Sequence, residues 1–265
     1  MNQLLSELKS IQKELKEFQT QLFVSIITEG VDDPGILKCI FLAGGPGSGK
    51  SYTAKEIFGV GKSDMASVSA GGLKVISSDV AFEQALKKNG INPKDLADIQ
   101  KNDPNFWAYI AGESGDSIRN RSKEITKQQQ AFYEAGRLGM IIDGTGDEVL
   151  KIRNKKNHAE QLGYDCYMVF VNTSLEVALK RNKERSRSLP DSLVKDIWSK
   201  CQENMGKFQG IFGGNFIIVD NTEYHPISNS VQKQVDAFLR KPIENPIGKK
   251  WIVGARTLKK ANIIK

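Results

Sequence analysis

The apolar positions of this chain are concentrated in five short segments that are separated by longer polar stretches. The segments cover residues 36–43, 73–77, 138–142, 164–171 and 215–219. Runs of this length between turn-forming residues predict buried strands, and the stretches between them predict helices. Strands that alternate with helices need crossover connections, which favour a parallel sheet with helices on both faces. We therefore expect an α/β fold: a three-layer sandwich around a mostly parallel five-stranded sheet.

A different pattern precedes the first predicted strand. Within residues 1–30 the apolar side chains alternate spacings of four and three, at Leu4, Leu8, Ile11, Leu15, Phe18 and Leu22. This spacing predicts an amphipathic helix with one narrow apolar seam. Because the seam covers fewer than three heptads, we expect it to pack against the rest of the chain, and oligomerisation through it is the less favoured alternative.

Charge marks the other end of the chain. The net charge is +7, and all of the excess lies between Arg240 and Lys265, where eight basic residues accompany the single acid Glu244. A basic tail can attract nucleic acid, an anionic partner or a membrane surface, although a solvated terminal segment is the commoner explanation. We expect an N-terminal helix at 1–30, a main domain at 36–222, and a C-terminal helix with a basic tail at 223–265.

Composition narrows the class of protein further. No segment has 18 consecutive apolar residues, and the N-terminus is polar, so we expect a cytoplasmic protein without membrane association. Cys39, Cys166 and Cys201 are far apart and the chain has 2 histidines, so no zinc-ligand spacing appears. Cys39 and Cys166 lie in strand segments, which favours an interpretation as small core residues.

The strongest motif follows the first predicted strand. Residues 44–51 read GGPGSGKS, a complete match to the phosphate-binding pattern G-x-x-x-x-G-K-[ST], and a segment compatible with a helix comes next. Backbone N–H groups in such a loop approach the phosphates closely, Lys50 reaches the β- and γ-phosphates, and Ser51 binds Mg²⁺. The sequence therefore predicts a nucleoside triphosphate site formed by Gly44, Gly45, Pro46, Gly47, Ser48, Gly49, Lys50, Ser51 and Tyr52.

Two acids end predicted strands and are candidates for the chemistry. Asp79 follows the second strand and is a candidate general base for an acceptor hydroxyl, while a helix N-cap is an equally good explanation. Asp143 ends the third strand. It is a candidate Mg²⁺ ligand through a water, or a contact to the acceptor together with Thr145, and capping of the next helix is the alternative.

Arginines form the last group of candidates. Ser174 or Thr173 can cap a helix that leads to Arg181, Arg185 and Arg187. Guanidinium groups suit the charge that develops on a transferred phosphoryl group, although a solvated helix end is the alternative. Arg119 and Arg121 are candidate contacts to an anionic acceptor, and a solvated helical face is at least as good an explanation.

The order of these features resembles the zeta-toxin family of P-loop kinases and, more loosely, polynucleotide kinases and other small phosphotransferases of bacteria and phages. The similar region spans about residues 36–222, and its carriers are GGPGSGKS at 44–51, ISSD at 76–79, IIDGTG at 141–146, GYDCYMVFV at 163–171 and RNKERSRSLP at 181–190. This chain has Asp143 where the toxins usually have Glu, which shortens the reach of the carboxylate by one methylene.

The resemblance implies roles for several residues. Asp79 would be the catalytic base, Asp143 and Thr145 would contact the acceptor, and Arg181 and Arg187 would hold ATP phosphates, with Arg185 as the alternative to Arg181. It also implies ATP as the nucleotide and a helical lid over it. Zeta toxins phosphorylate a hydroxyl of a UDP-amino sugar, and residues 80–125 contain no acceptor signature that matches this family.

These observations lead to one hypothesis and two alternatives. We expect an ATP- and Mg²⁺-dependent kinase that transfers the γ-phosphoryl group to a hydroxyl of a nucleotide sugar or a related small acceptor, with Lys50, Asp79, Arg181 and Arg187 as catalytic residues. The first alternative is a polynucleotide 5′-hydroxyl kinase that uses the basic tail. The second is a P-loop ATPase or nucleotide-gated assembly module that drives an assembly and oligomerises through the N-terminal seam.

Overall fold

The computed structural model of the protein describes residues 31–33, 35–60, 68–69, 71–185, 188–223 and 225–260. The amphipathic helix expected within residues 1–30 lies outside this part of the chain, as do Arg187 and the last five residues of the basic tail.

Five parallel strands form one sheet in the order β2-β3-β1-β4-β5. They are β1 (Lys38–Ala43), β2 (Lys74–Ile76), β3 (Met140–Asp143), β4 (Asp165–Asn172) and β5 (Phe216–Asp220). Each begins and ends within two residues of the segment that the apolar pattern predicts. The predicted parallel five-stranded sheet is thus confirmed, with β1 in the centre, so that the loop after β1 has strands on both sides.

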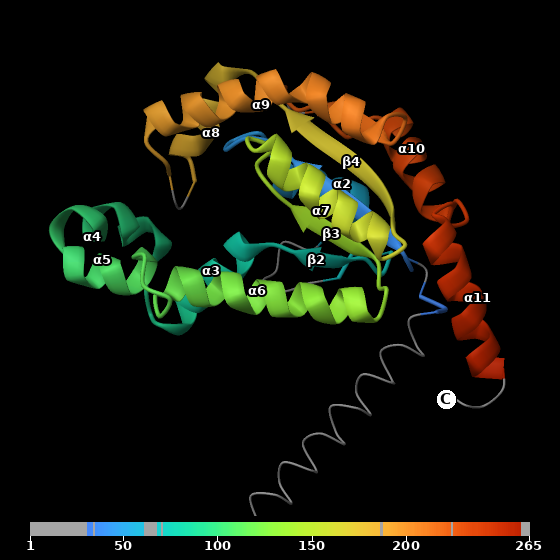
Figure 1. The fold of residues 1–265 in the computed structure, drawn as a ribbon. Coiled ribbons are helices and arrows are strands. Elements are labelled where there is room, and N and C mark those ends of the chain that lie inside the picture. Colours follow the sequence, from blue (N-terminus) through green and yellow to red (C-terminus); the bar gives the residue numbers. More distant parts are fainter. Residues whose placement is uncertain are drawn as a thin grey trace, which may run out of the picture.

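The alternation of side chains along β1 explains the two outer layers. Cys39 and Phe41 point to one face, where they pack with α7 (Val149–Gln161) and α9 (Asp191–Phe212). Ile40 and Leu42 point to the other face, toward α2 (Lys50–Phe58) and α10 (Asn229–Arg240). Figure 1 shows helices on both sides of the sheet, which confirms the three-layer sandwich. Cys39 and Cys166 are both buried in the core, as expected.

The polar region between β2 and β3 forms a separate helical group. It contains α3 (Ser78–Lys88), a 3₁₀ turn (Pro93–Asp95), α4 (Leu96–Asn102), α5 (Pro104–Ala111) and α6 (Ile118–Ala135). These helices share a small core of their own, made by Phe82, Leu86, Ile91, Leu96, Ile110 and Ile118. In Figure 1 the α4–α5 pair extends beyond the sheet, on the side where α8 (Leu175–Lys183) also lies.

The C-terminal segment forms two helices, α10 and α11 (Pro246–Lys260), where one helix and a tail were expected. The turn between them is bound at the first residue of β4, because Asp165 accepts hydrogen bonds from the backbone N–H groups of Glu244 and Asn245, each at 2.9 Å. Helix α11 therefore begins at the amino ends of the strands. No helix in the described ranges is long and apolar enough to cross a bilayer.

Candidate active site

The phosphate loop connects β1 to α2 and is shaped by its glycines. Gly47 and Gly49 have φ angles of 74° and 88°, a region that side chains disfavour. A Cβ atom on Gly47 would lie 2.3 Å from the carbonyl oxygen of Ala178, and one on Gly49 would lie 2.0 Å from Nδ2 of Asn221. The loop thus needs glycine because α8 and Asn221 press against it, in addition to the close approach of phosphates that the motif predicts.

The other residues of the motif lie at the start of α2. The ammonium group of Lys50 donates a hydrogen bond of 2.6 Å to the carbonyl oxygen of Gly44, so it bends back over the loop. Ser51 is exposed on the first turn of α2. The hydroxyl group of Tyr52 donates to the carbonyl oxygen of His225 at 3.3 Å. Tyr52 therefore connects α2 to the segment that follows β5.

The two strand-ending acids lie in one pocket with Lys50. Ser77 donates from its hydroxyl to Oδ2 of Asp143 at 3.0 Å, and Asp79 forms an ion pair with Arg119. Neither acid is a helix N-cap, since Ser77 occupies that position for α3 and Glu148 for α7. The capping explanations for Asp79 and Asp143 are therefore wrong, and both carboxylates face the pocket.

Asp143 is the more buried of the two acids. Burial raises the pKa of its carboxyl group, while the Lys50 ammonium and the Ser77 hydrogen bond lower it in part. Its Oδ1 atom is buried and has no hydrogen-bond partner among the described residues. A buried carboxylate oxygen without a partner is costly, so a ligand for it is to be expected.

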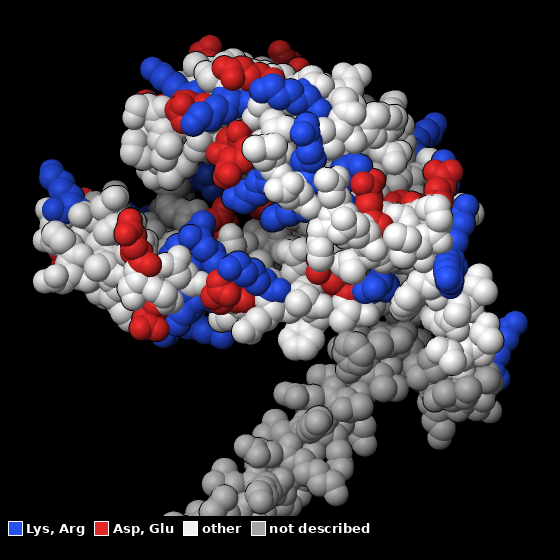
Figure 2. All heavy atoms as spheres, viewed as in Figure 1, with Lys and Arg blue, Asp and Glu red and all other residues white. Residues whose placement is uncertain are grey.

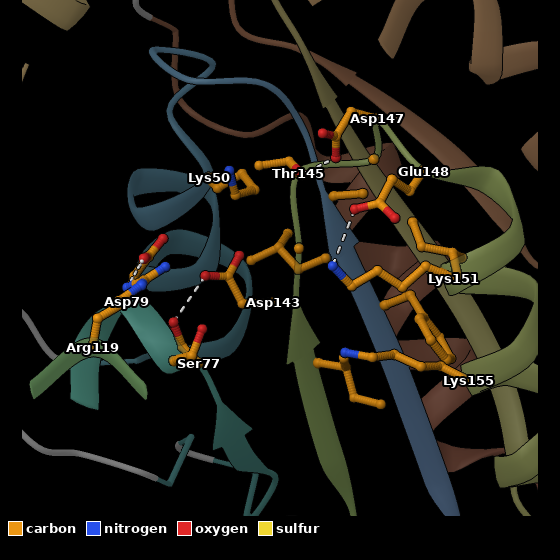
Figure 3. Close-up of a pocket in the computed structure, with 18 residues that line it drawn as sticks. Lys50, Ser77, Asp79, Arg119, Asp143, Thr145, Asp147, Glu148, Lys151 and Lys155 are labelled. Carbon is orange, nitrogen blue, oxygen red and sulfur yellow. Dashed lines mark hydrogen bonds and ion pairs between the residues drawn. The ribbon is translucent and has the colours of Figure 1, made fainter. Parts of the chain in front are cut away.

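The pocket has a volume of about 230 Å³. One wall is made by Ser77, Asp79 and Arg119, and the opposite wall by residues of α7 and of the turn before it, as Figure 3 shows. In Figure 2 the surface is hollowed between the α4–α5 side and the α8 side, with Lys and Arg side chains along the edges. Of the residues that line this pocket, the sequence predicted Lys50, Asp79, Arg119, Asp143 and Thr145 as site residues but did not indicate Ser77, Asp147, Glu148, Lys151 and Lys155.

Helix α9 holds the turn that follows β3. The thiol of Cys201 donates to the carbonyl oxygen of Thr145 at 3.2 Å, and Nδ2 of Asn204 donates to the carbonyl oxygen of Asp147 at 2.9 Å. The hydroxyl group of Thr145 is itself bonded to the carboxylate of Asp147. Burial, together with Asp147, raises the pKa of Cys201 to about 12, so this thiol stays protonated and can donate.

The arginine candidates have different positions. Arg181 on α8 donates from Nη1 to the carbonyl oxygen of Asn221 at 2.7 Å, beside the phosphate loop. Ser174 caps α8, as expected. Arg119 lines the pocket, whereas Arg121 is not among the described lining residues and lies over the Tyr109 ring at 5.9 Å. Arg185 follows the end of α8 and is exposed.

Asn221 is a further residue of the site that the sequence pattern did not indicate. It is buried, it follows β5 directly, and its Nδ2 atom donates to the carbonyl oxygen of Ser48 at 2.8 Å. Asn221 therefore joins the phosphate loop to Arg181. Its position directly after a predicted strand could have indicated it, because residues that follow parallel strands gather at the carboxyl edge of the sheet.

The central phosphate loop, the parallel sheet and the acids at its carboxyl edge define a P-loop kinase domain. The model of the family AAA_33, described as an AAA domain, matches residues 39–205, and the chain belongs to this family. The class that the motifs predict is thus confirmed. A search of curated proteins finds no match.

Several solved structures are similar to this chain. A chain of the PezAT chromosomal toxin–antitoxin system of Streptococcus pneumoniae has a TM-score of 0.45 and 14% identity, with coverage of 95% of this chain and 96% of that one. The AvrRxo1-ORF1:ORF2 structure with ATP gives a TM-score of 0.46, 13% identity and coverage of 87% and 73%. A chain of the Pnkp1/Rnl/Hen1 RNA repair complex has a TM-score of 0.41 and 17% identity, with coverage of 65% of this chain and 46% of that one.

Proposed function

We propose that this protein transfers the γ-phosphoryl group of ATP to a hydroxyl group of a nucleotide sugar or a related small acceptor. The observation that supports this most is that Lys50, Asp79 and Asp143 line the same pocket at the end of the phosphate loop. A P-loop lysine and a carboxylate that faces an open space are what positioning of a γ-phosphate and activation of a hydroxyl require.

The loop amides and Lys50 would hold the β- and γ-phosphates of ATP. Ser51 and Asp143 fit a Mg²⁺ ion, because Oδ1 of Asp143 is a buried oxygen without a partner among the described residues. No group of three His, Cys, Asp or Glu residues in the described ranges could hold a metal by itself, which suits an ion that is held mainly through the nucleotide. When bound, Mg²⁺ would neutralise charge on the phosphates.

The acceptor hydroxyl would lie against Asp79. Its oxygen attacks the γ-phosphorus, the bond from that phosphorus to the β–γ bridging oxygen breaks, and ADP leaves. Asp79 orients the hydroxyl group and takes its proton. Arg181 lies beside the loop and would neutralise charge on the phosphates, and Arg187 has the same proposed role.

The proposal is tested with γ-labelled ATP, Mg²⁺ and separate pools of nucleotide sugars, nucleosides and 5′-hydroxyl oligonucleotides. Label should appear in the nucleotide-sugar pool, Lys50→Ala should abolish transfer, and Asp79→Asn should lose transfer while it still binds ATP. Asp98→Asn, an exposed carboxylate on α4, is the matched control and should behave as the wild type. Normal turnover by Asp79→Asn would overturn the assignment of the base.

The alternatives remain distinguishable in the same experiment. Label on oligonucleotides would identify a polynucleotide kinase, and label released as free phosphate in every pool would identify an ATPase. The position of α11 does not favour the first of these, since this basic helix begins at the amino edge of the sheet and the phosphate loop lies at the carboxyl edge. The seam on which the ATPase alternative relies lies outside the described residues.

A further inference from the structure

Helix α7 contributes two lysines to the wall of the pocket that faces Asp79. Lys151 and Lys155 are four residues apart and therefore share one face of the helix. Both line the pocket. Figure 3 shows their side chains reaching from α7 toward the strands, across the space from Asp79 and Arg119. The proposed phosphoryl transfer from ATP uses neither of them.

The cations of the pocket differ in what they contact. Lys50 donates to the carbonyl oxygen of Gly44, Arg119 is paired with Asp79, and Lys151 is 3.2 Å from the carboxylate of Glu148. Lys155 is half-buried and has no hydrogen bond or ion pair with any residue in the described ranges. Burial, with the neighbouring Lys151, lowers the pKa of Lys155, while Asp143 and Glu134 raise it in part.

A half-buried ammonium group without a hydrogen-bond or ion-pair partner is unfavourable. The aliphatic stem of a lysine can cover apolar surface, but such a lysine usually directs its head to water or to an acid. The head of Lys155 instead lies in the pocket that holds the proposed base. Asp143 and Glu134 act on it electrostatically, but no hydrogen bond or ion pair joins it to a described residue, so an anionic molecule that enters this pocket would supply its direct partner.

We propose that Lys155, with Lys151 beside it, binds a phosphate group of the acceptor, so that the acceptor is a phosphate-bearing small molecule whose free hydroxyl group faces Asp79. An ammonium group binds phosphate oxygens as a point charge, and Lys151 on the same face adds a second positive charge, which suits the multiple negative charge of a phosphate group. The proposal rests on the proposed function for the direction of the hydroxyl group, and it excludes neutral sugars and nucleosides as good acceptors.

The first test measures binding and needs no turnover. The phosphate loop is filled with a non-hydrolysable ATP analogue and Mg²⁺, and the affinity for inorganic phosphate is then measured by equilibrium binding. Lys155→Gln should weaken phosphate binding about tenfold or more, the loss expected for a charged hydrogen bond. Lys155→Arg should keep most of the affinity. Arg153→Gln removes an exposed charge from the same helix and should have no effect.

The second test compares label transfer to nucleotide sugars with transfer to the free sugars and nucleosides that a nucleotide pyrophosphatase and a phosphatase release from them. Transfer should require the phosphate group, and Lys155→Gln should raise KM for the acceptor while the affinity for ATP stays unchanged. Phosphate binding that is equal in Lys155→Gln and wild type, or weaker ATP binding in the variant, overturns the inference. Transfer to dephosphorylated acceptors only would also overturn it and leave the kinase intact. Binding that depends on Lys155 without transfer would refute the kinase instead.

Discussion

Nη1 of Arg119 lies 2.8 Å from Oδ1 of Asp79. Arg119, a candidate contact to the acceptor, thus forms an ion pair with the proposed catalytic base. Arg119 also stacks over the Phe82 ring at 4.9 Å, which limits the directions that its guanidinium can take. The Asp79 side chain remains 49% exposed and open to the pocket. Arg119 is therefore placed to orient the carboxylate toward an incoming hydroxyl group.

This arrangement predicts the effect of Arg119→Gln. Loss of the charged hydrogen bond removes the guanidinium that orients the Asp79 carboxylate and should lower kcat about tenfold, with the affinity for ATP unchanged. Arg119→Lys should recover part of the loss. Arg121→Gln is the matched control, because Arg121 lies two residues further along α6 and is exposed. Equal losses in the two variants would contradict an orienting role for Arg119.

The buried carboxyl group of Asp143 should make the stability of the fold depend on pH. Because burial raises its pKa, the folded protein holds a proton on this carboxyl group more tightly than the unfolded chain does. The contribution of Asp143 to the free energy of unfolding is thus largest below the unfolded pKa of about 4 and is lost as the pH rises through the raised pKa. Without nucleotide, Asp143→Asn should melt at a higher temperature than wild type at neutral pH, and this gain should disappear below about pH 4.

Thermal unfolding at a series of pH values measures this difference. Asp98→Asn on the exposed face of α4 is the control and should not change the profile. ATP with Mg²⁺ should stabilise the wild type more than Asp143→Asn, since only the wild type keeps the carboxylate for the ion. A variant that melts below the wild type at neutral pH would contradict the assignment of an unsatisfied buried charge.

The sequence predicted the strands well because each is a short apolar run with clear boundaries, and β1 with its glycine loop specifies the nucleotide site almost by itself. It predicted the helical region before β3 less well, since residues 80–137 contain four separate helices with breaks near Gly90, Pro104 and Gly112. The contribution of α7 to the pocket was missed. Two lysines on a polar helix look like a solvated face until the sheet order places that helix beside Asp143.

Asn221 predicts a link between the loop and Arg181. Asn221→Ala removes the hydrogen bond to the carbonyl oxygen of Ser48 and leaves that buried group without its partner, which should lower stability by about 1–3 kcal/mol. The affinity for ATP should fall about tenfold, because the phosphate loop loses its side-chain link to the residue whose backbone carbonyl oxygen holds Arg181. Asn229→Ala, at an exposed position on α10, is the control. Unchanged ATP binding in a folded Asn221→Ala variant would contradict this link.

We expect the apolar residues of the C-terminal segment to support the fold and the basic residues of α11 to be dispensable for it. Ile243 belongs to the core, and Trp251 and Ile252 pack against it, so removal of residues 240–265 should destabilise the whole domain. Replacement of the exposed Lys249, Lys250 and Arg256 by Gln should leave the fold intact. Since α11 begins at the amino edge of the sheet, this triple variant should transfer phosphate to small acceptors at the wild-type rate. If the wild type transfers phosphate to oligonucleotides less well as salt is added, and the triple variant loses this transfer, the result would instead support a nucleic-acid acceptor.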